Sequence, residues 1–181
     1  MSPSFIAACV QMRGRKDPSA NCDDAVRMIR EAAARGATFV QTPEISNLVN
    51  RDRETMMKSL FTEDKDPMLQ AFQALARELK ITIHAGSLSI KNGDKVANRA
   101  FVISPSGDIA ARYDKIHLFD VDLANGETWR ESNTFTGGSE AVVVDTPNAK
   151  LGVAICYDVR FPYLFRAPVA RPTNALHLFV L

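Results

Sequence analysis

DPMLQAFQALARELKITIHAG, residues 66–86, is the stretch that decides the fold. Asp66 suits a helix cap and Pro67 suits the first helical position, and the apolar residues that follow recur at helical spacing. They are Leu69, Phe72, Leu75, Ala76 and Leu79. Residues 81–86 then form a short apolar run, which is typical of a buried strand. The stretch therefore predicts a helix that leads directly into a strand.

The same alternation of strand and helix is found upstream. Residues 5–12 and 37–42 are β-rich apolar runs bounded by breakers, so both are predicted strands. Between them we expect a helix, with Asn21 as its N-cap and Gly36 just past its end. Its apolar face contains Val26, Ile29 and Ala33. The first half of the chain thus reads as βαβ crossovers.

Downstream, the pattern changes to strands joined over short distances. The turn clusters at 92–94 and 104–108 predict hairpins. Further predicted strands are residues 99–103, 141–146 and 150–157. Crossovers followed by hairpins predict an α/β fold with a mixed sheet, covered by helices on at least one face. Residues 118–138 fit neither pattern, and a loop of that length in a compact domain is more often functional than idle.

Composition and charge exclude several classes of protein. A chain of 181 residues with 46% hydrophobic and 24% charged residues has the composition of one globular domain. Its net charge of +1, without long charge blocks, argues against a nucleic-acid partner. No apolar run reaches the roughly 18 residues of a membrane span, and the amino terminus lacks the features of a signal peptide. Three cysteines imply no disulfide framework, so we expect a reducing cytoplasm.

Cys156 is the candidate nucleophile. It ends the strand-like run LGVAIC, where a strand can fix a thiol and the following turn can expose it. A small buried core cysteine is the alternative interpretation, and composition alone does not choose between the two. Cys9 and Cys22 are expected to be small buried cysteines, the first inside an apolar strand and the second in the opening turn of a helix.

Glu44 and Lys115 also follow extended segments, Glu44 at the exit of a predicted parallel strand, where ligands tend to bind. Taken singly, either residue is typical of a solvated surface charge. His84, His117 and His177 lack the spacing of a metal site. A catalytic pair of Cys156 with His117 stays open, although it has no signature of its own.

Four segments together resemble a known family. They are QTPE at 41–44, YDKIHLF at 113–119, WRES at 129–132 and GVAICYDVRFP at 152–162. In this order they are similar to the carbon-nitrogen hydrolases of the nitrilase superfamily, and most similar to the amidase branch that includes deaminated-glutathione amidases and omega-amidases.

The resemblance implies a role for each matching residue. Cys156 would be the nucleophile, Glu44 the general base, Lys115 the stabiliser of the oxyanion and Glu131 a second carboxylate near the site. The implied reaction is hydrolysis of the C–N bond of a small linear amide through a cysteine thioester, with release of ammonia. Nitriles and N-carbamoyl compounds are alternative substrates. No metal or organic cofactor is implied, and the expected partners are a small-molecule amide and further copies of the chain in a homodimer or larger homo-oligomer.

The resemblance also implies a four-layer α-β-β-α sandwich, here expected to be truncated. It divides the chain into residues 1–166, the amino-terminal part of a carbon-nitrogen hydrolase domain, and residues 167–181, a divergent tail. Pro168 and Pro172 stand where the family carries a helix, and residues 175–181 are expected to be a strand lacking its neighbours. A catalytically inactive truncated product, or a pairing module of the same fold, is therefore the alternative function.

Overall fold

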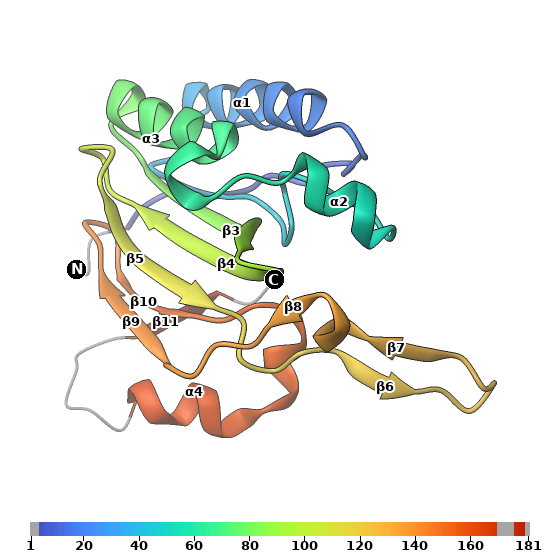
Figure 1. The fold of residues 1–181 in the computed structure, drawn as a ribbon. Coiled ribbons are helices and arrows are strands. Elements are labelled where there is room, and N and C mark those ends of the chain that lie inside the picture. Colours follow the sequence, from blue (N-terminus) through green and yellow to red (C-terminus); the bar gives the residue numbers. More distant parts are fainter. Residues whose placement is uncertain (1–3, 170–175, 180–181) are drawn as a thin grey trace.

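The computed structural model describes residues 4–169 and 176–179 and arranges them in four layers (Figure 1). Helices α1 (Pro18–Ala34) and α3 (Pro67–Leu79) cover one face of a first sheet. A second sheet lies against the other face, and helix α4 (Pro162–Val169) lies beyond the second sheet. The predicted mixed sheet and the α-β-β-α order are thus confirmed.

The first sheet has six strands in the order β1-β2-β3-β4-β5, with β8 also beside β4. Their bounds are β1 (Ala7–Cys9), β2 (Phe39–Gln41), β3 (Thr82–Asn92), β4 (Lys95–Ile103), β5 (Ile109–Asp114) and β8 (Phe135–Thr136). The crossover strands β1, β2 and β3 are parallel, whereas the hairpin strands β3, β4 and β5 are antiparallel. Both kinds of connection agree with the turn and helix signals in the sequence.

The helices follow from their caps, with one correction. Asp66 caps α3 as predicted, because its Oδ1 accepts a hydrogen bond of 2.9 Å from the backbone N–H of Leu69. Helix α1 is capped by Asp17 instead of Asn21, which lies one turn inside the helix, where its buried amide donates to the carbonyl of Asn47. Two short helices, α2 (Arg53–Ser59) and η1 (Glu63–Lys65), were not predicted. None of the helices in the described ranges is long and apolar enough to cross a membrane.

The second sheet has the order β11-β10-β9. Its strands are β9 (Val142–Asp145), β10 (Lys150–Val153) and β11 (Leu176–Phe179). Strand β11 pairs in parallel with β10, so the expectation of a strand without neighbours is wrong. Helix α4 forms despite Pro168, which lies one residue from its end and can disturb only the last turn. Pro172 is outside the described residues.

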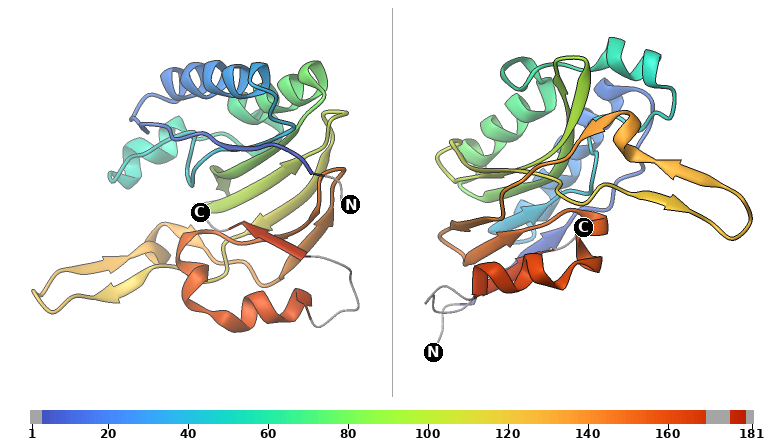
Figure 2. Two further views of the ribbon diagram at one scale, coloured as in Figure 1. Left: turned by 180° about the vertical axis from the view of Figure 1, so that it is seen from behind. Right: turned by 60° about the horizontal axis from the view of Figure 1, so that its bottom comes forward.

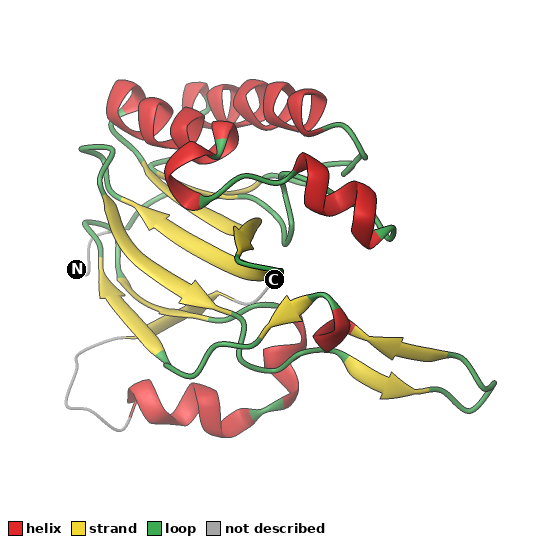
Figure 3. Cartoon of the chain, in the orientation of Figure 1, coloured by secondary structure: helices red, strands yellow, loops and turns green. Residues whose placement is uncertain are grey.

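Residues 118–138 contain regular structure that the sequence did not indicate. Strands β6 (Asp120–Asp122) and β7 (Thr128–Arg130) form a hairpin that projects from the body of the molecule (Figures 2 and 3). A short helix, η2 (Glu131–Asn133), follows it. Strands of two or three residues are too short to show a period of two, which explains the missed prediction.

The core between the two sheets explains how the strands are held. Successive side chains of a strand point to opposite faces. In β4, Ala100 and Val102 pack towards the second sheet with Leu151 and Val153, whereas Phe101 packs with the helix-facing core. Because both faces are buried, the two sheets are fixed relative to each other, and so are the segments that leave their strands.

Candidate active site

Glu44 lies in a tight turn after β2. Its neighbour Ile45 has a φ of 51°, which is unusual for a β-branched residue. The turn is fastened to β3 at Ser87, whose hydroxyl accepts a hydrogen bond of 2.8 Å from the N–H of Ile45. The carbonyl of Ser87 also accepts one of 2.9 Å from the N–H of Ser46. The first sheet therefore fixes the backbone that carries Glu44.

Lys115 directly follows β5 and points into the protein. Its side chain is only 2% exposed, so the interpretation as a solvated surface charge is wrong. The ammonium Nζ lies 3.0 Å from Oε1 of Glu44 and 2.9 Å from Oε2 of Glu131. One cation thus bridges two carboxylates that are 71 and 16 residues away in the sequence.

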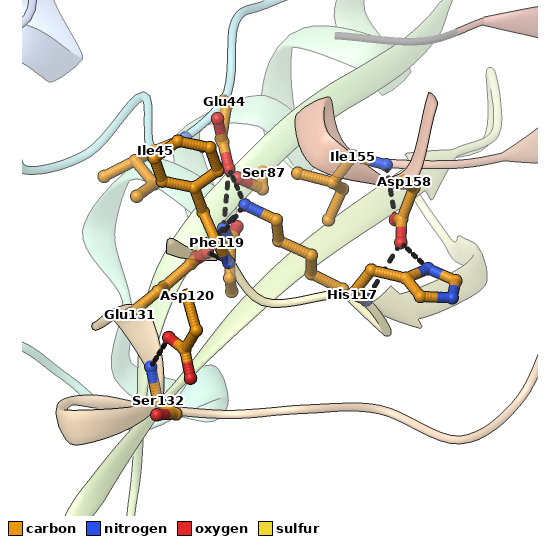
Figure 4. A network of polar contacts seen from close by, with 12 residues as sticks. Glu44, Ile45, Ser87, His117, Phe119, Asp120, Glu131, Ser132, Ile155 and Asp158 are labelled. Carbon is orange, nitrogen blue, oxygen red and sulfur yellow. Dashed lines mark hydrogen bonds and ion pairs between the residues drawn. The ribbon is translucent and has the colours of Figure 1, made fainter. Parts of the chain in front are cut away.

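Glu131, at the start of η2, is held on more sides than Glu44. Its Oε2 also accepts a hydrogen bond of 2.7 Å from the backbone N–H of Phe119. Figure 4 shows how the two carboxylates converge from different segments. Among the described residues, the two nitrogen donors that contact Glu44 both use its Oε1, which leaves Oε2 for a proton.

Asn98 is a member of this cluster that the sequence analysis missed. Its fully buried side-chain amide donates to Oε1 of Glu44 at 2.8 Å and to Oε1 of Glu131 at 3.3 Å. The only signal in the sequence is a polar residue within the apolar strand β4, and such residues are buried only when they have partners. Asn98 and Lys115 together set the separation of the two carboxylates.

Cys156 begins the short helix η3 (Cys156–Arg160) after β10, as the sequence predicted for a thiol between a strand and a turn. Its φ of 44° is in the left-handed region that non-glycine residues rarely adopt. Burial raises the pKa of its thiol to about 11, the charge of Glu44 and a hydrogen bond to that carboxylate add to the increase, and Lys115 opposes it. The thiol is therefore protonated at neutral pH and needs a base, and Glu44 is in contact with it.

The ammonium of Lys115 keeps its charge in this environment. Burial alone would lower its pKa, but the negative charges of Glu44 and Glu131 outweigh burial and raise it. The site thus combines a thiol, a carboxylate that can accept its proton and a permanent cation, which together suit acyl transfer.

His117 does not join the thiol, as a cysteine-histidine pair would require. Its Nδ1 lies 2.7 Å from Oδ1 of the buried Asp158, and its ring stacks on Phe161 at a centroid distance of 3.6 Å. Among the described residues, no group of three or more His, Cys, Asp or Glu side chains is arranged to hold a metal ion. Cys9 is exposed on the edge strand β1, which corrects its expected burial, and Cys22 is half-buried.

A pocket of about 290 Å³ lies beside Glu44. Its walls are largely apolar and include Leu48, Met56 and Phe135, and Arg51 is the one cation among the described residues that line it. The guanidinium of Arg51 lies 5.0 Å from the centroid of the Trp129 ring, on β7. None of the carboxylates in residues 4–169 forms an ion pair with it.

Comparisons of the chain with known proteins all point to one family. The model of the carbon-nitrogen hydrolase family matches residues 6–180. The chloroplastic omega-amidase of Arabidopsis thaliana is 34% identical over 175 residues, which are 95% of this chain and 47% of that protein. Deaminated glutathione amidase of Synechocystis is 34% identical over 167 residues, 90% of this chain and 61% of that protein. The chain therefore spans about half to three fifths of the length of these relatives.

Solved structures agree with this result. The NitFhit protein of C. elegans superposes with a TM-score of 0.85 at 28% identity, covering 97% of this chain and 43% of that one. The shared part contains all four layers described above.

Proposed function

Because the chain belongs to the carbon-nitrogen hydrolase family, we propose that it hydrolyses the C–N bond of a small linear amide through a thioester on Cys156. The observation that carries the proposal is the convergence of Glu44, Glu131 and the buried ammonium of Lys115 at the site where the charges of all three act on the Cys156 thiol. Relatives that are named amidases support the class of reaction.

In the first half of the reaction, Glu44 takes the proton of the Cys156 thiol while the sulfur attacks the amide carbon. The carbonyl electron pair moves onto the oxygen, and prepositioned donors must stabilise the oxyanion. Lys115 and the backbone N–H of Tyr157, in the first turn of η3, are the proposed donors. Glu44 then gives its proton to the nitrogen, the C–N bond breaks, and ammonia leaves a thioester on Cys156.

In the second half, Glu44 deprotonates a water molecule that attacks the thioester carbon. The C–S bond breaks, the sulfur recovers the proton from Glu44, and the carboxylic acid leaves. The proposed role of Glu131 is to hold Lys115 and Asn98, because its oxygens accept hydrogen bonds from both and from the backbone of Phe119.

The pocket beside Glu44 favours an amide that carries a carboxylate at its other end. Glu44 and Glu131 outnumber Lys115, so the cluster itself repels an anion, and Arg51, which lines the pocket and pairs with none of the described carboxylates, can bind one. A planar guanidinium supported by an aromatic ring suits bidentate binding of a carboxylate. We therefore propose the monoamide of a dicarboxylic acid as the substrate class, ahead of nitriles and N-carbamoyl compounds.

The test is release of ammonia by the purified chain, with mass spectrometry of Cys156 to detect the acyl adduct. We expect a dicarboxylic acid monoamide to be hydrolysed and Cys156→Ala to abolish the reaction. Arg51→Ala should raise KM at least about tenfold for the monoamide and leave an uncharged amide of equal length unchanged. Hydrolysis that survives Cys156→Ala would refute the mechanism, and a wild-type chain without turnover would favour the inactive or pairing form. The cytoplasmic location, the homo-oligomeric state and the division at residue 166 stay predictions.

A further inference from the structure

Asp158 is a buried acid with hydrogen bonds on both of its oxygens, and the mechanism does not use it. Its side chain is fully buried and accepts four hydrogen bonds. Oδ2 accepts from the hydroxyl of Tyr113 at 2.6 Å and from the N–H of Ile155 at 3.0 Å. Oδ1 accepts from the N–H of His117 at 3.0 Å and contacts Nδ1 of the same residue at 2.7 Å.

These bonds join two segments that carry the two ends of the site. Asp158 lies two residues after Cys156, and His117 lies two residues after Lys115. One carboxylate therefore ties the turn of the thiol to the segment of the ammonium, although the two are 41 residues apart. Figure 4 shows Asp158 between Ile155 and His117, beside the cluster around Glu44.

From this geometry we propose that Asp158 is a positioning residue, which holds the Cys156 turn in register with the Lys115 segment so that the thiol meets Glu44. The inference rests on the proposed function of Cys156. Two observations support it beyond burial. The bond to Ile155 fixes the residue just before the left-handed Cys156, and the Phe161 ring, from the same turn, packs flat on His117 at an interplanar angle of 8°.

A positioning role of Asp158 differs from a merely structural one because it links Asp158 to the effect of Glu44 on the Cys156 thiol. If Asp158 sets the contact between the thiol and Glu44, its loss must weaken the influence of Glu44 on the thiol in molecules that are still folded. A structural role would lower stability and leave that influence intact. The distinction can be measured through the pH dependence of Cys156 alkylation, which requires no amide turnover.

The experiment compares Asp158→Asn with Asp66→Asn in the full chain. Asp66 is a matched control, because it is 2% exposed and its carboxylate also accepts a backbone N–H and a side-chain donor. In the wild type, Glu44→Gln should lower the pKa of Cys156 alkylation by iodoacetamide, since a negative neighbour and acceptor is lost. The same change is made in each Asp→Asn background, and stability is measured by denaturation.

We expect the effect of Glu44→Gln to shrink at least by half in the Asp158→Asn background and to persist with Asp66→Asn. For the amide, kcat should fall about a hundredfold with Asp158→Asn, while KM stays within about twofold, as expected for misplaced reacting groups. Tyr113→Phe, which removes one donor only, should give a smaller loss and serves if Asp158→Asn does not fold. An unchanged effect of Glu44→Gln in Asp158→Asn or Tyr113→Phe would overturn the inference. Failure of the wild type to hydrolyse amides would refute the proposed function and leave the alkylation result to decide on Asp158.

Discussion

Two acidic clusters lie side by side in this molecule and differ in how fully their carboxylates are hydrogen-bonded. Around Glu44 and Glu131, two carboxylates share one ammonium and one amide, Glu131 also accepts the N–H of Phe119, and the two side chains keep 23% and 13% exposure. Around Asp158, one fully buried carboxylate has four donors. Glu44, which accepts its nitrogen donors on Oε1 alone, has the capacity to move protons, whereas Glu131 and Asp158, with four hydrogen bonds each, hold their neighbours in place. The number of hydrogen bonds that a carboxylate accepts thus distinguishes the proposed base, Glu44, from the positioning residue Asp158.

The largest expected effect comes from a substitution in the first cluster that replaces the carboxylate of Glu44. Glu44→Gln removes the proposed base and should lower kcat by roughly 10²–10⁴-fold, the usual contribution of general acid-base catalysis. Stability should change little, because Lys115 keeps its pair with Glu131. Steady-state kinetics and denaturation check both expectations. Retention of more than a tenth of the turnover would show that another group takes the proton.

Lys115→Met tests how far the first cluster depends on its cation. We expect kcat to fall at least about a hundredfold, as for the loss of an oxyanion donor, and the free energy of unfolding to fall by about 3 kcal/mol, because two carboxylates remain without a counter-ion. Lys115→Arg should not restore turnover, since a planar guanidinium does not replace a compact ammonium. Adding Glu131→Gln to Lys115→Met should recover part of the stability. A stability change below about 0.5 kcal/mol would be the behaviour of a surface lysine.

His84 lies outside both clusters and tests what happens when a buried titratable group has an atom without a hydrogen-bond partner. It is buried in β3, its Nε2 has no hydrogen-bond partner among the described residues, and burial lowers its pKa to about 4. His84 binds a proton near pH 6.5 in the unfolded chain but only near pH 4 in the folded chain. The contribution of neutral His84 to the free energy of unfolding is therefore fully present above pH 6.5 and is lost as the pH falls from 6.5 to 4. The total loss should be roughly 3 kcal/mol. Denaturation at a series of pH values checks this, and in His84→Gln the slope between pH 6.5 and 4 should flatten.

The sequence predicted the features that depend on local signals. The cap at Asp66 and the apolar stripe of α3 are local, and so is the turn that joins β3 to β4. Glu44, Lys115 and Cys156 were identified because each leaves a strand and because the surrounding motifs resemble a family, and the structure brings the three together.

What could not be predicted depends on partners that are distant in the sequence. Lys115 appears as a surface charge until Glu44 and Glu131 are placed around it. Asn98 is one polar letter in an apolar strand, and its role exists only through the two carboxylates. Asp158 has no local signal either, since three of its four donors come from residues 113–117.

The smallest expected effect concerns the backbone of the thiol itself. At a φ of 44°, a side chain costs about 1–2 kcal/mol that glycine does not, and glycine loses about 0.5–1 kcal/mol more entropy on folding. Cys156→Gly should therefore be more stable than Cys156→Ala by about 0.5–1 kcal/mol in denaturation. Equal stability of the two variants would show that the turn carries no strain at this residue.

At Cys156, the substitution that would favour folding is one that would abolish the proposed catalysis. A glycine there would ease the backbone and end the reaction, so a search for stabilising substitutions that measures only melting temperature should favour removal of the nucleophile. Libraries made to stabilise this fold would have to be screened for thiol reactivity as well, because at this position improvement by one measure is loss by the other.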